Sequence, residues 1–223
     1  RNTTASTINS LGLLVFVAAN VPRISHTLNT GGEGFILDEV QRTNLVINSN
    51  DFTLWNNQQF WSITNSISPE GIGNAQTLTF TGANQFSQRS TSLAAGVICS
   101  SSIFVKGVLN QTIIFNAGGV DQTFTFTGVW QRLTNENKTS TNSSITFSTF
   151  GGVTARTFQV YGAQLEAAAT ASSYIATGAA ATTRNDDLIT LAPPASTVKI
   201  TTTFSDNTTQ ILTTIPATYT LPT

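Results

Sequence analysis

Few residues in this chain are of the types that catalyse reactions or bind metals. There is one histidine, His26, and one cysteine, Cys99. A zinc site or a Cys-His nucleophile needs a second ligand or partner, so both are nearly excluded. The sequence contains no Gly-x-Ser-x-Gly elbow, P-loop or dinucleotide fingerprint. We therefore expect no catalytic residue, no metal site and no cofactor.

Carboxylates are the remaining catalytic candidates. Glycoside hydrolysis needs only two carboxylates, and the chain has 11 acidic residues. The number of acids therefore does not exclude a glycoside hydrolase. These acids lie in turns or beside arginines, which favours structural roles. Glu166 ends a predicted strand over 157–166, on which Phe158 and Val160 share one face. Without an irregularity, that face continues through Gly162 to Glu166 and draws the carboxylate to the edge of the core.

A bulge at Gly162 is the alternative, and it is the one we expect. It would shift the register and turn Ala163 and Leu165 inward. Glu166 would then lie at the rim, in a structural ion pair with Arg42 or Arg184.

The segment from Trp55 to Trp61 has the composition of a sugar-binding site. An aromatic ring can stack on the apolar side of a pyranose while amide side chains bond its hydroxyl groups. If the rings are exposed, Trp55, Asn57, Gln59 and Trp61 form a candidate glycan-binding platform. The competing interpretation, which we favour, is that both tryptophans anchor the core, because large aromatic side chains are highly buried on average.

The elements that must position these residues are strands. Apolar or aromatic residues alternate with hydroxyl residues, which is typical of strands with one buried face. Glycines follow many of these segments, where turns or bulges need a positive φ. The clearest alternating segments are 77–81, 123–127 and 144–148, and further strands are expected over 103–105, 112–115 and 198–201.

No apolar stripe of helical period and length occurs, so the predicted fold is all-β: an antiparallel β-sandwich of jelly-roll type. Composition divides the chain into three parts. Residues 1–43 are expected to be an N-terminal arm that packs on the body, and residues 44–191 the jelly-roll body. Residues 192–223 are expected to be a small β-hairpin appendage around Asp206-Asn207.

Charge is scarce. Only 9% of residues are charged, 39% are hydrophobic and the net charge is -1. The 14 phenylalanines and the low net charge exclude a disordered chain. Lys and Arg number 10 against 11 acids, so no basic footprint for nucleic acid exists. The longest apolar run, 11–19, is far below the ~20 residues that span a bilayer, so no membrane insertion is expected.

Several segments, taken in order, resemble a family of tailed-bacteriophage virion proteins. The resemblance covers about residues 1–190. That family is found in head fibres, head decoration proteins and tail fibres, and it is similar to carbohydrate-binding jelly rolls of the CenC type. Ala176 departs from it, because the family usually has proline there. The segments are Asn20–Arg23, Gly34–Glu39, Gln41–Leu45, Asn50–Phe52 with Trp55, Phe104–Gly107, Trp130–Arg132, Tyr161–Glu166, Ser173–Thr177 and Arg184.

The resemblance implies a non-enzymatic structural protein on the virion surface, as a capsid decoration, head fibre or tail fibre module. Other virion proteins would be its partners, and family members are commonly homotrimers. The alternative is an adhesin that binds a host surface glycan, and a weaker one is a polysaccharide depolymerase.

Overall fold

The computed structural model describes residues 3–58, 63–150, 154–187, 190–191, 193–203 and 208–220. Their regular structure is β-strand apart from one 3₁₀ turn, η1, at Phe52–Leu54. None of these residues belongs to a helix long and apolar enough to cross a bilayer. The strands are β1 (Ala5–Ile8), β2 (Leu14–Val17), β3 (Ile24–Thr27), β4 (Gly31–Ile36), β5 (Arg42–Asn44), β6 (Asn56–Gln58), β7 (Ile63–Ser66), β8 (Ala75–Phe80), β9 (Phe86–Ser90), β10 (Ile98–Gly107), β11 (Thr112–Ala117), β12 (Val120–Thr125), β13 (Gln131–Thr139), β14 (Ser144–Ser148), β15 (Arg156–Glu166), β16 (Thr182–Arg184), β17 (Thr190–Leu191), β18 (Ile200–Thr203), β19 (Thr209–Leu212) and β20 (Tyr219–Thr220).

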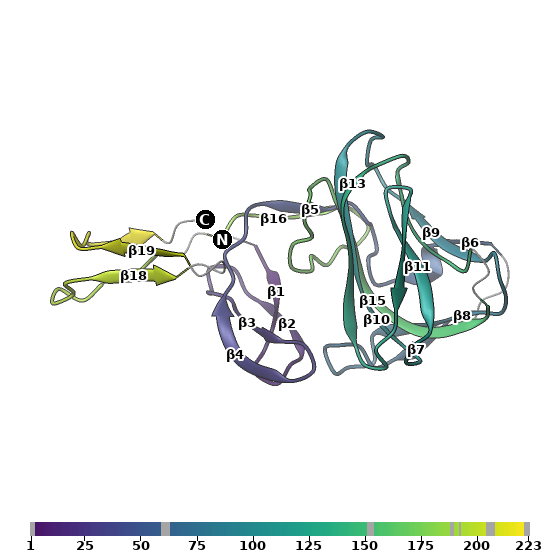
Figure 1. Ribbon diagram of the computed structural model, residues 1–223, viewed down its shortest axis with the longest axis horizontal. Helices are drawn as coiled ribbons and strands as arrows, with labels where there is room; N and C mark the ends of the chain where they lie inside the picture. The colour runs from purple at the N-terminus through teal and green to yellow at the C-terminus, as the bar shows by residue number, and fades with distance from the viewer. Residues whose placement is uncertain are drawn as a thin grey trace.

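Two five-stranded antiparallel sheets form the body (Figure 1). One has the order β13-β10-β15-β8-β7 and is called the covered sheet, because N-terminal strands pack on its outer face. The other has the order β12-β11-β14-β9-β6 and is called the open sheet. The predicted antiparallel β-sandwich of jelly-roll type is confirmed, and the predicted strand over 144–148 coincides with β14.

Alternate residues of the strands fill the space between the sheets. Pleating sends successive side chains to opposite faces, so Phe80 of β8 points inward and is almost fully buried. Phe147 of β14 lies among other rings: its centroid is 5.1 Å from that of Phe115, 5.6 Å from Phe158 and 6.0 Å from Trp55. The alternating Thr/Phe segments of the sequence thus build one aromatic core.

The first 36 residues contain two β-hairpins, β1-β2 and β3-β4, which pack against each other and are called the lobe. Leu14 of β2 contacts a second apolar cluster on the outer face of the covered sheet, with Phe104, Trp130 and Tyr161. Figure 1 shows the lobe beside the sandwich, with β5 and β16 running above it. β5 spans the expected boundary at residue 43 and pairs with β16, which ties both ends of the body together.

The C-terminal part carries two small antiparallel pairs, β18 with β19 and β17 with β20. Ile200 lies opposite Leu212, so the hairpin expected there is present, and its Asp206-Asn207 turn lies outside the described residues. Tyr219 is buried, and its hydroxyl group lies 3.0 Å from an oxygen of Thr202 and of Gln210. In Figure 1 this hairpin projects away from the sandwich, on the far side of the lobe.

Candidate functional site

Trp55 does not meet the condition for a sugar platform. Its side chain is 3% exposed, and its ring centroid lies 4.7 Å from that of Phe52 and 6.0 Å from that of Phe147. A ring enclosed by the core has no free face for a pyranose, so assigning Trp55 to a glycan site is wrong, and it is a core anchor. Asn57 lies in β6, whereas Gln59 and Trp61 lie outside the described residues.

The outer face of the open sheet has polar chemistry that the local sequence pattern did not reveal. Phe115 and Phe147 point into the core, so by strand parity their neighbours point outward. With strands about 4.8 Å apart, one line across five strands extends ~19 Å. The backbone register forms such a line, called the amide row, from Asp121, Asn116, Thr146 and Gln88, and the backbone of Asn56 in β6 continues it.

A second line beside the amide row carries one aromatic and one aliphatic side chain among hydroxyl residues. The register places Thr123, Ile114, Ser148 and Phe86 in it, and the backbone of Gln58 continues it. The ring centroid of Phe86 lies 6.0 Å from that of Phe150, which follows β14 and is 38% exposed. Phe86 itself is half-buried. The face therefore combines a partly exposed ring pair with the amide of Gln88 and the hydroxyl groups of Thr123 and Thr146, the two elements that sugar recognition needs. Asn116 and Ser148 are buried.

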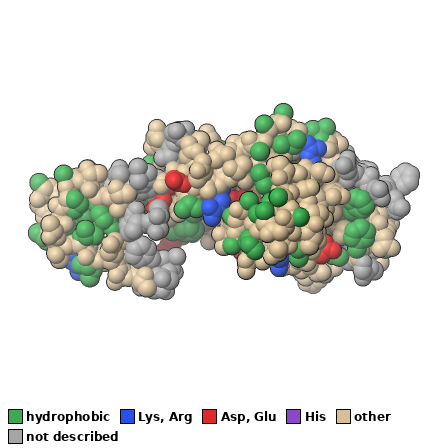
Figure 2. Space-filling view, turned by 90° about the horizontal axis from the view of Figure 1, so that it is seen from above, with side chains coloured by type: hydrophobic (Ala, Val, Ile, Leu, Met, Phe, Trp, Pro, Cys, Tyr) green, Lys and Arg blue, Asp and Glu red, His purple; other side chains and the backbone are tan. Residues whose placement is uncertain are grey.

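The face is nearly uncharged. Asp121 is the acid in these two lines, and its carboxylate accepts a hydrogen bond from Asn116 Nδ2 at 3.0 Å. Neither line contains Lys or Arg, so the two lines offer no cation for a sulfate or uronate group. Figure 2 shows the same scarcity more widely, because few Lys, Arg, Asp or Glu side chains appear on the surface seen there.

The expected bulge in β15 is present. Gly162 has a φ of +66°, and the pairing of β10 with β15 shifts register between Ser102 and Phe104. Beyond this point Ala163 and Leu165 are fully buried in the main core.

The ion pair expected at Glu166 is not formed. Its carboxylate is buried and accepts hydrogen bonds from Gln164 Nε2 at 2.8 Å, from the Ser172 amide at 2.9 Å and from the Ser172 hydroxyl at 2.6 Å. Within the described chain, no ion pair joins Glu166 to Arg42 or Arg184. The segment after β15 folds back over the outer face of the covered sheet, so the position predicted as a rim is enclosed.

Arg184 instead belongs to a buried charge cluster, called the ionic knot, which joins the lobe to the segment 172–187. Arg23 Nη2 lies 2.8 Å from Glu39 Oε2 and also contacts Asp187. Arg184 lies 3.5 Å from Glu39 and 3.6 Å from Asp187. Both guanidinium groups are inaccessible to solvent. The knot contains two cations and two anions, so the buried charges balance.

Glu39 of the knot and the neighbouring Asp38 have shifted pKa values. Burial would raise the pKa of Glu39, but Arg184, the hydrogen bonds from Ser173 and Arg23 together hold it below its usual range. The pKa of Asp38 is raised, first by burial and then by the nearby carboxylate of Asp187. Both Asp38 carboxylate oxygens are buried without a hydrogen-bond partner. Glu39 therefore has the partners that a buried carboxylate needs, and Asp38 lacks them.

Several of the segments that carry the family resemblance lie at the seam between lobe and sandwich, whereas Phe52, Trp55 and Val105 lie in the main core. Asn44 is fully buried, and its Nδ2 donates to the carbonyl groups of Ala163 and Ile175 at 3.0 and 2.8 Å. Asn50 Oδ1 accepts from the Gly162 amide at 2.8 Å and from the Tyr174 hydroxyl at 2.9 Å. None of these segments contributes a residue to the two lines on the open sheet. These segments therefore stabilise the fold, and they do not indicate a ligand.

The single cysteine is buried, and the single histidine contacts a backbone carbonyl group. Cys99 is a buried free thiol whose pKa is raised by burial, which opposes thiolate formation. His26 Nδ1 lies 2.8 Å from the Gly32 carbonyl oxygen. Over the described ranges, no three His, Cys, Asp or Glu residues are grouped so that they could hold a metal ion.

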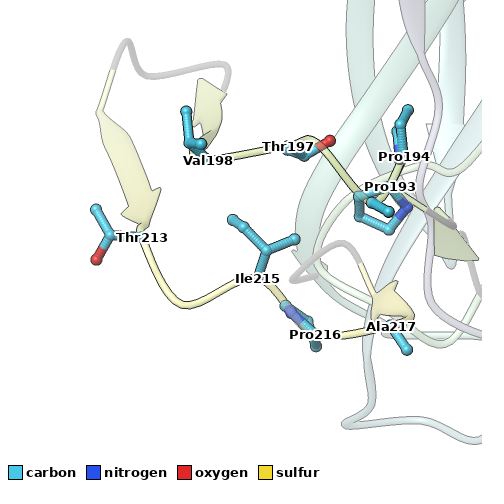
Figure 3. A pocket seen from close by; sticks show the side chains of 9 residues that line it. Pro193, Pro194, Thr197, Val198, Thr213, Ile215, Pro216 and Ala217 are labelled. Carbon is cyan, nitrogen blue, oxygen red and sulfur yellow. The ribbon is translucent and has the colours of Figure 1, made fainter.

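The C-terminal appendage contains an open hollow of about 560 Å³ (Figure 3). It lies between the segments 193–198 and 213–217, and Pro193, Pro194, Ile215 and Pro216 line it. Its remaining lining residues are alanine, valine and threonine. With no charged or amide side chain in its wall, the hollow has few groups to orient a polar ligand.

No protein-family model and no curated protein matches the sequence. Among solved structures, the CBM22-1 xylan-binding domain of Paenibacillus barcinonensis Xyn10C is similar, with 14% identity, a TM-score of 0.36, and coverage of 58% of this chain and 94% of that chain. TmCBM61 in complex with beta-1,4-galactotriose is also similar, with 16% identity and a TM-score of 0.38. The similarity covers 55% of this chain and 97% of that chain.

The enzymatically active domain of bacteriophage CBA120 tailspike protein 4 gives 9% identity and a TM-score of 0.39. That similarity covers 55% of this chain and 21% of the tailspike chain. The fold class of this chain rests on its own sheet topology.

Proposed function

We propose that this protein is a non-enzymatic glycan-binding module of a phage virion, and that it binds a neutral glycan on the outer face of the open sheet. The observation that carries the proposal is the amide row beside the partly exposed ring pair of Phe86 and Phe150. A sugar lying on this face would stack on a ring, and amide and hydroxyl side chains would bond its hydroxyl groups.

The charge of the face limits the ligand class. Asp121 would repel a sulfated or uronate-rich polymer, and neither line supplies a cation to offset that repulsion. A neutral chain of hexoses or pentoses suits the face better.

A glycan array with purified protein is the test. Phe86→Ala should weaken binding of the best neutral glycan about tenfold, the equivalent of roughly 1.4 kcal/mol. Phe35→Ala is the matched control, because Phe35 is an exposed phenylalanine on β4 of the lobe. The control should bind like the wild type. Equal losses in both variants, or no glycan bound by the wild type, would reject the proposal.

The virion surface is the proposed location, with other virion proteins as partners and a homotrimer as the assembly. The ordered motif set supports this placement. Purified particles should contain the protein in stoichiometric amounts by mass spectrometry, and light scattering should give three times the chain mass of 23.7 kDa.

Structural decoration without glycan binding is the second candidate, and the lobe surface favours it. Leu11, Phe35, Ile24 and Ile36 are each more than half exposed, although apolar side chains of this size usually find a partner surface when they cluster. Stoichiometric occupancy of the particle together with no glycan bound would support decoration.

A further inference from the structure

A cavity of about 310 Å³ lies between the lobe and the covered sheet. It is open to solvent, and three parts of the chain line it: the lobe, strands β10 and β13 through Phe104 and Arg132, and the segment 171–174. Its volume is at the small end of the range for small-molecule sites. The lobe contributes Ile8, Leu14 and Leu28 to the wall, together with the polar residues Ser6, Thr7, Ser25 and His26.

Most polar groups in the cavity wall already have partners. The Ser6 hydroxyl donates to the Tyr174 carbonyl at 2.7 Å, and the Thr7 hydroxyl donates to the Ile24 carbonyl at 3.0 Å. The oxygens of Glu39 accept from the Ser173 amide and hydroxyl and also pair with the arginines of the ionic knot. These groups therefore have little left to offer a ligand.

Arg132 is different. Both hydrogen bonds of its guanidinium come from Nη2, to the Ser102 hydroxyl at 2.7 Å and the Ser172 carbonyl at 2.5 Å. Nε is buried without a partner, and Nη1 has no hydrogen bond to the described residues. The group is held in place over the Phe104 ring, 5.6 Å from its centroid. Nη1 of Arg132 is therefore the donor left for a ligand, in a wall that mixes aliphatic and polar side chains.

The charges around Arg132 decide which acceptor suits it. Burial lowers the pKa of Arg132, and Glu166, Glu39 and Glu136 counter that effect from a distance. No carboxylate lies within 4 Å of the guanidinium in the described chain. Three acids therefore supply the countercharge, and a further anion in the chamber would meet their repulsion and a desolvation cost. Arg132 lacks an oxygen acceptor rather than a negative charge.

We propose that this cavity binds a small uncharged molecule with a compact apolar body and one carbonyl-type oxygen, which accepts a hydrogen bond from Arg132. The apolar body fills the space between the aliphatic lobe residues and the sheet. This site is separate from the open sheet, so its test does not depend on whether the protein binds a glycan.

The test uses two probes of equal shape, cyclohexyl methyl ketone and cyclohexanecarboxylate, titrated into the full chain and followed by NMR. We expect saturable binding of the ketone at about 1 mM or tighter, and at least tenfold weaker binding of the carboxylate. No binding of the ketone, or tighter binding of the carboxylate, would overturn the proposal.

Variants separate the site from general stability. Ala171 lines the cavity, and Ala171→Leu should fill it and abolish ketone binding while leaving Arg132 in place. Arg132→Met should remove the preference for the ketone over its hydrocarbon analogue isopropylcyclohexane. Phe35→Ala, which is outside the lining, should bind the ketone like the wild type. Ketone binding that survives Ala171→Leu would contradict the assigned site.

Discussion

Replacing Arg23 tests whether the ionic knot holds the lobe to the sandwich. Arg23 is 1% exposed, and it bonds the Ser6 carbonyl at 3.1 Å, the Ser173 hydroxyl at 2.7 Å and both acids of the knot. Arg23→Met keeps most of the side-chain volume but leaves Glu39 and Asp187 with one cation fewer. Breaking a buried ion pair in this way costs about 3–5 kcal/mol.

Because Arg184 remains in the knot, we expect the loss of stability caused by Arg23→Met to lie at the lower end of that range. Arg184 lies 3.5 Å from Glu39 and 3.6 Å from Asp187, so it continues to compensate both carboxylates. We expect Arg23→Met to lower the free energy of unfolding by about 3 kcal/mol, a large share of the 5–15 kcal/mol of an ordinary domain. Urea unfolding measures the loss, and hydrogen exchange should show it first in β1–β4.

The double variant Arg23→Met/Asp187→Asn is the control for this reasoning. Removing the orphaned carboxylate should recover part of the lost stability, giving a non-additive cycle. A change below about 0.5 kcal/mol for Arg23→Met, as at exposed positions, would refute the idea that the knot fastens the lobe.

Three further substitutions have defined outcomes. Gly162→Ala should cost about 2–4 kcal/mol in urea unfolding, because φ is +66° and a Cβ would lie 3.2 Å from the buried Tyr174 ring; a neutral result would contradict the bulge. Asp38→Asn should raise the melting temperature at pH 7, because its raised folded pKa makes the ionised form unfavourable, and the gain should shrink as the pH falls through that raised pKa and be gone below about pH 4, where Asp38 is protonated in both the folded and the unfolded chain; a lower melting temperature at pH 7 would reverse that assignment. Trp55→Ala should cost about 3–5 kcal/mol while the folded fraction keeps its glycan affinity, and a selective loss of binding would restore Trp55 as a platform.

Strand pattern and core could be predicted because they depend on local alternation. The pattern over 144–148 sends Ile145 and Phe147 inward, as parity requires, and both are fully buried. The bulge at Gly162 was also predictable, since parity broke there and glycine adopts a positive φ at no cost.

The partners of Glu166 could not be predicted from the strand alone. They come from Ser172, on a segment that folds back over the sheet, and no local pattern shows where such a segment lies. The amide row could not be predicted for the same reason, because it depends on which distant segments become neighbours. Gln88 and Thr146 are 58 positions apart in sequence and become neighbours only through the register of β9 with β14.

Chemical-shift mapping with a neutral oligosaccharide tests the central claim most directly. The account predicts that the largest backbone amide perturbations fall on Phe86, Gln88 and Thr146 of the open sheet, with those of Thr77 and Gln159 on the covered sheet unchanged. Saturable binding whose perturbations map to the covered sheet or to the C-terminal appendage, and leave β9 and β14 unaffected, would contradict it.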